Sequence, residues 1–269
     1  MKPSSLSIIA RFTWLEARYG HLLWIALLMS VLLLISGWFL QAISVIELDL
    51  NAVSIMAPVA RLVAIAIIGV FVISGTCRTL EQRGLDMILS APVSRSQWLL
   101  GRLTGLMLAA IVIAIFAGLP LTLFASPLRV AQWTLSLAGE LVMVAALGLM
   151  LSVSLTRLPA ALLGLFSVYL CARTIGVISL LNASGIPSTI SDKADVVAGT
   201  DLLSTLSDAV VTSLSVLLPR LDLMAQTQWL SEPVIDQMLL PIGSGLVQAA
   251  IYVAISVSVG VIDFDHRDV

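Results

Sequence analysis

The chain has 269 residues, of which 59% are hydrophobic and 11% are charged, and its formal net charge is -2. Soluble domains carry about 25% charged residues, so the composition excludes a soluble globular protein and predicts an all-α polytopic membrane protein, with residues 1–269 forming a single transmembrane domain. The charge balance gives no sign of nucleic-acid binding. Cys77 and Cys171 lie in or beside apolar runs and do not form the pattern of a disulfide framework or a metal site.

Residues 5–19 come before the first long apolar run and have the periodicity of an amphipathic helix. Such a helix is expected to lie in the membrane interface, parallel to the membrane plane. The alternative interpretation is a basic anchor for the first span. The apolar face holds Ile8, Phe12, Leu15 and Tyr19, and the polar face holds Ser7, Arg11 and Arg18.

Long apolar runs follow along the rest of the chain. A transmembrane helix needs about 20 consecutive, mostly apolar residues, and six segments meet this requirement. An even number of spans places both termini on the same side of the membrane. The predicted spans are residues 22–44, 54–77, 99–124, 133–155, 159–181 and 244–262.

The distribution of lysine and arginine predicts the orientation, because cytoplasmic loops are enriched in these residues. Nine lie on the side that holds the termini, three lie on the other side, and Arg61 and Arg173 fall inside spans. We therefore expect both termini to be cytoplasmic. The nine are Lys2, Arg11, Arg18, Arg78, Arg83, Arg95, Arg102, Arg157 and Arg267, and the three are Arg129, Lys193 and Arg220.

A charged, amphipathic stretch separates the second span from the third. Thr79-x-x-Gln82 has the spacing of a capping box, which predicts a helix that begins at Leu80 and occupies residues 79–90. Pro92 is expected to end this segment, because the residue before a proline disfavours the α region. The alternative is a solvated loop with a basic anchor.

The third span begins with its own signals. Ser94-x-x-Gln97 is a second capping-box pattern. Gly101-x-x-x-Gly105 then places a stripe of small residues on one face, which lets another helix approach closely. This stripe fits packing within one subunit better than a seam between two subunits.

Residues 182–243 are the largest segment outside the predicted spans. The first part is polar, and two later apolar runs are interrupted by prolines and acidic residues, so neither is a clean crossing. We expect re-entrant or interfacial helices on the outer side, before the last span. The alternative, in which one run is a true span, would make the span count odd.

The end of the chain contains Asp263, Asp265 and His266. With Asp268, three acids and one histidine fall within six residues and could bind a cation, but a solvated stop after the last span is the preferred interpretation. No Ser/His/Asp arrangement or His-Glu-x-x-His helix occurs in the sequence, so no catalytic or metal-binding residues are predicted.

The stretch between the second and third spans also carries a specific motif. An acidic residue and a nearby glycine are followed by a Leu-Ser-Ala-Pro-Val-Ser-Arg turn and by Leu-Gly-Arg at the start of the next span. This pattern resembles the first cytoplasmic loop of the permease subunits of ABC-2-type exporters, with Arg102 where that family more usually has lysine. The matching residues are Glu81-Gln82-Arg83-Gly84, Ile88-Leu89-Ser90-Ala91-Pro92-Val93-Ser94-Arg95 and Leu100-Gly101-Arg102.

The resemblance implies that residues 79–90 form a cytoplasmic coupling helix seated on a separate ATPase subunit. The chain has no Gly-x-x-x-x-Gly-Lys-Ser/Thr loop, so it is expected to bind no cofactor and to be no enzyme itself. ATP and Mg²⁺ would belong to the ATPase, present in two copies, and the permease would pair with itself or with a second permease. The residues that this implies for ATPase coupling are Glu81, Arg83, Gly84, Asp86, Leu89 and Pro92.

Arginines inside predicted spans are costly and are functional candidates. In the ABC-2 family the second and fifth spans line the translocation path, so the resemblance makes Arg61, Tyr169 and Arg173 substrate-path candidates. The arginines would then contact an anionic substrate group. The preferred alternative is snorkelling to the outer headgroups or structural pairing.

The predicted function is therefore that of the permease subunit of an ATP-driven exporter in the cytoplasmic (inner) membrane of a bacterium, surrounded by lipids. An extracytoplasmic partner is compatible with residues 182–243. Two alternatives stay open. An ion-gradient-driven secondary transporter would need inverted repeats and buried acids, and Glu140 is the one acid well inside a span. An intramembrane enzyme acting on lipid or haem would need clustered acids or histidines at one interface, which the C-terminal run alone offers.

Overall fold

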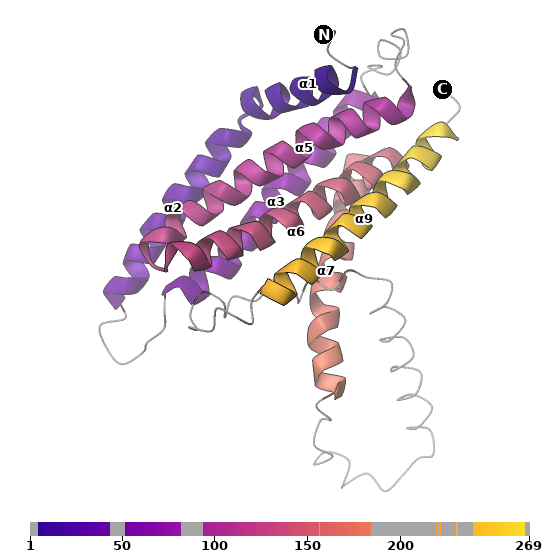
Figure 1. Ribbon diagram of the computed structural model, residues 1–269. Helices are drawn as coiled ribbons and strands as arrows, with labels where there is room; N and C mark the ends of the chain where they lie inside the picture. Colours follow the sequence, from indigo (N-terminus) through magenta and orange to yellow (C-terminus); the bar gives the residue numbers. More distant parts are fainter. Residues whose placement is uncertain are drawn as a thin grey trace, which may run out of the picture.

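A computed structural model describes residues 5–43, 52–81, 94–155, 157–183 and 239–266, together with Pro219, Leu221 and Leu230. Throughout these ranges the regular secondary structure is helical (Figure 1). The elements are α1 (Ser5–Tyr19), α2 (Leu22–Ile43), α3 (Ala52–Glu81), α5 (Arg95–Gly118), the short 3₁₀ helix η1 (Leu119–Leu123), α6 (Pro127–Leu155), α7 (Leu158–Ala183) and α9 (Leu239–Asp265).

Five of these helices are long and apolar enough to cross a membrane, with stretches of 21 to 29 residues. The apolar stretch of α7 within the described side chains, Leu158–Thr174, is shorter. The chain is thus a helical, multi-pass membrane-embedded protein, while the count of six spans stays a prediction. The five stretches are Leu22–Ala42, Ala52–Leu80, Arg95–Leu123, Pro127–Leu155 and Gly243–Phe264.

Helix α6 lies at the centre of the bundle, between α5 and α9 and against α3 and α7 (Figure 1). In its apolar stretch 67% of the residues are buried, against 33% for α2 and 22% for α9. The exposed side chains of α2 are large and apolar, among them Trp24, Leu32 and Trp38. Helices α2 and α9 therefore form the periphery of the bundle, and α6 forms its core.

One end of the bundle gathers the start of α1, the start of α5 and the end of α9 (Figure 1). The Trp98 and Phe264 rings are 5.6 Å apart, and Arg95 Nη1 donates a hydrogen bond of 2.6 Å to the Phe264 carbonyl oxygen. The Arg95 guanidinium also lies 5.5 Å from the centre of the Phe264 ring. These contacts fix the last turn of α9 against the first turn of α5.

Helix α1 confirms the predicted helix over residues 5–19, and it packs along the first half of α5 (Figure 1). A Cβ added at Gly101 would lie 2.8 Å from the Ile9 Cβ, and one added at Gly105 would lie 2.5 Å from the Thr13 Cβ. The stripe of small residues therefore serves packing within the chain. Ile8, Phe12 and Tyr19 stay exposed, and the interfacial position of α1 stays a prediction.

Replacing Gly105 by alanine is expected to destabilise the protein by about 1–3 kcal/mol, because the new methyl group overlaps Thr13 and forces α1 away from α5. Gly164→Ala is the matched control, since its Cβ would meet Leu155 Cδ1 at an ordinary 3.5 Å. The measurement is thermal unfolding in detergent, together with protease cleavage of α1. Equal unfolding midpoints and cleavage rates in the two variants would contradict the packing argument.

The boundary between α3 and the following loop differs from the prediction. A helix start at Leu80 is wrong, because α3 continues without a break to Glu81. The Thr79 hydroxyl donates to the Gly75 carbonyl oxygen at 2.8 Å within the last turns of α3, so Thr79 does not act as an N-cap. The rest of the predicted helix over residues 79–90 lies outside the described residues.

The second capping box is confirmed. The Gln97 backbone N–H donates to Ser94 Oγ at 3.3 Å, and the Gln97 side chain accepts from the Ser94 backbone N–H at 3.5 Å. This reciprocal pair satisfies donors that a helix start otherwise leaves open. It fixes the first residue of α5 at Arg95.

Candidate functional site

Four side chains from three helices form a buried polar cluster in the bundle: Arg61 of α3, Trp133 and Glu140 of α6, and Tyr169 of α7. Arg61 Nη1 donates to Glu140 Oε2 in an ion pair whose side chains are 2% and 0% exposed. The Tyr169 hydroxyl donates to Glu140 Oε1 at 3.0 Å. The Arg61 guanidinium lies 5.2 Å from the centre of the Trp133 ring. Both carboxylate oxygens of Glu140 therefore have a donor.

Helix periodicity explains how the sequence assembles this cluster. Trp133 and Glu140 are seven residues apart, so they lie on one face of α6, two turns from each other. That face meets α3 at Arg61 and α7 at Tyr169. A charge buried in an apolar bundle is tolerated when it is paired and hydrogen-bonded. Glu140 provides Arg61 with both the opposite charge and a hydrogen-bond acceptor.

The preferred interpretation of Arg61 from the sequence is snorkelling or structural pairing. Structural pairing is confirmed by the ion pair with Glu140, and snorkelling is wrong because the buried guanidinium points into the bundle. Arg61 and Tyr169, both substrate-path candidates, do come together around one carboxylate. Glu140 itself was not among the predicted site residues. The signal for it was available, since a lone acid in one span and a lone arginine in another are natural partners.

Arg173, the third substrate-path candidate, follows Tyr169 by one helical turn on the same face of α7. Among the described residues, Arg173 Nη1 is buried and has no hydrogen-bond partner. The structure therefore brings Arg61 and Tyr169 together at Glu140 and places Arg173 one turn farther along α7.

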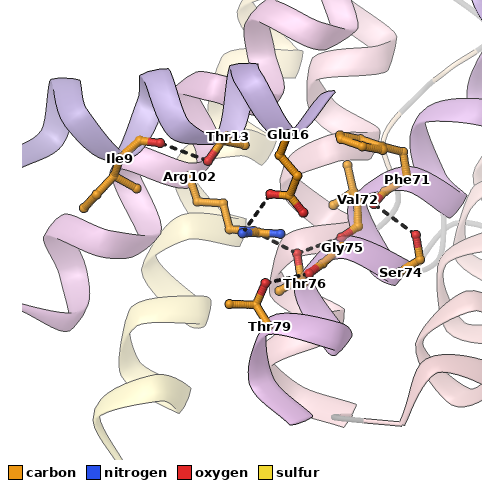
Figure 2. A network of polar contacts seen from close by, with 10 residues as sticks. All are labelled: Ile9, Thr13, Glu16, Phe71, Val72, Ser74, Gly75, Thr76, Thr79 and Arg102. Carbon is orange, nitrogen blue, oxygen red and sulfur yellow. Dashed lines mark hydrogen bonds and ion pairs between the residues drawn. The ribbon is translucent and has the colours of Figure 1, made fainter. Parts of the chain in front are cut away.

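A second polar network joins the last turns of α1 and α3 to the beginning of α5 (Figure 2). Arg102 of α5 forms an ion pair of 3.6 Å from Nη1 to Glu16 Oε2 of α1. Arg102 Nε donates to Thr76 Oγ1 of α3 at 3.2 Å, and the Thr76 hydroxyl donates to the Val72 carbonyl oxygen at 2.7 Å. One arginine thus joins α1, α3 and α5.

Glycine at position 75 makes room for this network (Figure 2). A Cβ added at Gly75 would lie 3.1 Å from Glu16 Oε1 and 3.2 Å from Arg102 Nη2. The Arg102 guanidinium also lies 5.6 Å from the centre of the Trp98 ring, and Arg102 is buried. The network is therefore a packed junction of three helices rather than a surface ion pair.

The predicted ATPase-coupling residues lie next to this junction in the chain. Glu81 is the last residue of α3, five positions after Thr76. Arg83, Gly84, Asp86, Leu89 and Pro92 lie outside the described residues, and their role stays a prediction. The structure does show that both helices flanking them, α3 and α5, are linked through Arg102.

An apolar groove of about 830 Å³ runs between α5, α6 and α9. Its walls include Met107, Leu135 and Val253, and its polar lining comes chiefly from Thr104 and Ser258. Such a surface offers dispersion contacts and little for a charged group to bind. The groove is therefore suited to hydrocarbon chains and offers too few polar groups to select a lipid headgroup.

Within the described part of the chain, no group of three or more histidine, cysteine, aspartate or glutamate side chains could hold a metal ion. The His266 ring Nδ1 lies 2.7 Å from the Ile262 carbonyl oxygen at the end of α9. Asp263 is partly buried, and the side chain of Asp265 is not among those described.

No known protein-family model matches this sequence, and no curated protein matches it either.

Proposed function

We propose that this chain is the permease subunit of an ATP-driven exporter of the ABC-2 type, coupled to a separate ATPase by the loop between α3 and α5. The observation that supports this best is the Arg102 junction. Arg102 links α5 to α3 through Thr76 and to α1 through Glu16, close to where the loop begins and ends. A force applied to residues 82–93 would then move three helices as one body.

The direction of the helices supports the predicted topology. The start of α1 and the end of α9 lie at the same end of the bundle (Figure 1), as six crossings with α7 as the fifth would require. We infer that this end is cytoplasmic and that the membrane is a bacterial inner membrane, because the lysine and arginine bias favours this side. In this proposal two permeases form the path and two ATPase subunits drive it.

The test is affinity purification of the tagged chain in mild detergent, followed by mass spectrometry and an ATPase assay. We expect a stoichiometric partner with a Gly-x-x-x-x-Gly-Lys-Ser/Thr loop. Glu81→Ala and Gly84→Ala are expected to reduce stimulation of its ATPase activity about tenfold or more without loss of folding, because losing contacts at an interface anchor costs about 2 kcal/mol or more.

Arg157→Gln is the matched control, since Arg157 is an exposed charge on the same predicted side but outside the motif. It should leave ATPase stimulation unchanged. Purification of the chain without any ATPase, or normal stimulation in both loop variants, would refute the proposal.

A second candidate function is an ion-gradient-driven transporter, and the burial of Glu140 favours it. Glu140 is a fully buried carboxylate between three helices, the kind of group that proton-coupled carriers use. The discriminating measurement is proton flux into vesicles that contain the purified chain alone. Proton flux in the wild type that is lost in Glu140→Gln would favour this candidate. No proton flux in the wild type would favour the exporter.

A further inference from the structure

The buried polar cluster has more hydrogen-bond donors than it has acceptors. Arg61 Nη2, Trp133 Nε1 and Arg173 Nη1 are buried, and none of them has a hydrogen-bond partner in the described part of the chain. Arg61 is 2% exposed and Trp133 is 0% exposed. Buried N–H groups are normally satisfied, and leaving one unpaired costs about 1–3 kcal/mol, more for a charged group.

These donors lie on faces of α3, α6 and α7 that meet at Glu140. The Arg61 guanidinium lies over the Trp133 ring at 5.2 Å, and Arg173 is one turn along α7 from Tyr169, whose hydroxyl shares the Glu140 carboxylate with Arg61. Glu140 takes no further donor easily, because Arg61 and Tyr169 already occupy its two oxygens. Glu140 and Tyr169 are therefore positioning residues. They hold Arg61 through its Nη1 atom and leave Nη2 able to donate to a bound group.

The charge balance points the same way. Among the described residues, Glu140 balances the charge of Arg61, whereas Arg173 has no ion pair, so one positive charge is left over. In a low-dielectric surrounding, an unbalanced charge is much more costly than in water. An anion with two or more acceptor oxygens would balance the charge and accept from the three donors together.

We propose that Arg61, Trp133 and Arg173 bind the carboxylate or phosphate group of a molecule that reaches the bundle from the membrane. As a substrate site, this rests on the transport function proposed above. The anionic group belongs either to a lipid headgroup or to the transported molecule. A cationic headgroup is repelled by the arginines, and an uncharged headgroup can accept hydrogen bonds but does not balance the remaining positive charge.

The experiment is thermal unfolding of the purified protein in a non-ionic detergent, with whatever partner copurifies. The probe is dioctanoyl phosphatidate, and dioctanoylglycerol is its matched control, which has the same tails without the phosphate. We expect phosphatidate to raise the unfolding midpoint of the wild type by about 4 °C or more relative to dioctanoylglycerol. The shift should fall by at least half in Arg173→Gln.

Arg157→Gln is the control variant, because Arg157 is exposed and lies just before the first residue of α7, at the other end of that helix from Arg173. It should keep the full shift. A double variant, Arg61→Gln with Glu140→Gln, removes the second arginine without leaving a buried carboxylate alone, and should also lose the shift. If the double variant does not fold, the shift measured in Arg173→Gln alone tests the proposal. No shift in the wild type, or an undiminished shift in Arg173→Gln, overturns the proposal.

Native mass spectrometry distinguishes the two sources of the anion. An anionic lipid that copurifies with the wild type and is lost in Arg173→Gln identifies a headgroup, whereas phosphatidate binding without copurified lipid indicates the transported molecule. The binding assay uses no ATP, so its result is independent of the ATPase test. A specific anion site without an ATPase partner would refute the exporter alone, and an ATPase partner without anion binding would refute the site alone.

Discussion

Replacing Glu140 by alanine is expected to destabilise the protein by about 3–5 kcal/mol, the cost of leaving one member of a buried ion pair alone. Arg61 is 2% exposed and cannot reach water without moving α3 relative to α6. The Tyr169 hydroxyl loses its acceptor in the same variant. The measurement is unfolding in mixed micelles of non-ionic detergent and dodecyl sulfate, followed by circular dichroism.

The double variant Arg61→Met with Glu140→Leu separates pairing from packing. It removes both charges and keeps apolar volume, so it should recover most of the lost stability, since a buried ion pair is often replaceable by apolar side chains. A double variant as unstable as Glu140→Ala would contradict this account. Equal stability of Glu140→Ala and the wild type would show that Arg61 does not depend on Glu140.

Replacing Arg102 by alanine is the second large effect, with an expected loss of about 2–4 kcal/mol from the charge-assisted contacts and from the packing of its stem. The variant removes the link from α5 to Thr76 of α3 and to Glu16 of α1. Because Arg102 is bonded to both α1 and α3, α1 should also become open to protease while the rest of the bundle stays folded. Thermal unfolding and limited proteolysis measure the two effects.

Two milder variants calibrate this result. Glu16→Gln should cost at most about 1 kcal/mol, because Glu16 is 30% exposed and its 3.6 Å ion pair is partly screened by water. Arg102→Lys should lie between wild type and Arg102→Ala, since a lysine keeps the charge but lacks the planar fork that reaches two partners at once. If Arg102→Ala costs no more than Glu16→Gln, Arg102 is not the junction of the three helices.

The helix boundaries show where sequence patterns are informative and where they fail. The predicted second span, residues 54–77, lies inside α3, which runs from Ala52 to Glu81. Hydropathy detects the apolar middle of a helix, but backbone hydrogen bonding continues past the last apolar residue. The Thr79 pattern wrongly predicted a helix start. A threonine with a glutamine three residues later can also lie inside a helix, where its hydroxyl donates to the carbonyl oxygen four residues earlier.

The sequence alone determined the membrane-embedded, all-helical class, the helix of residues 5–19 and the capping box at Ser94, because each depends on composition or on neighbours within one turn. It also marked Arg61 and Arg173 as costly groups that need a reason. The tertiary structure decided which groups meet. Arg61 finds Glu140 and Arg102 finds Thr76 because α3, α5 and α6 pack in one particular rotation, and that rotation is set by the fit of side chains from distant parts of the chain.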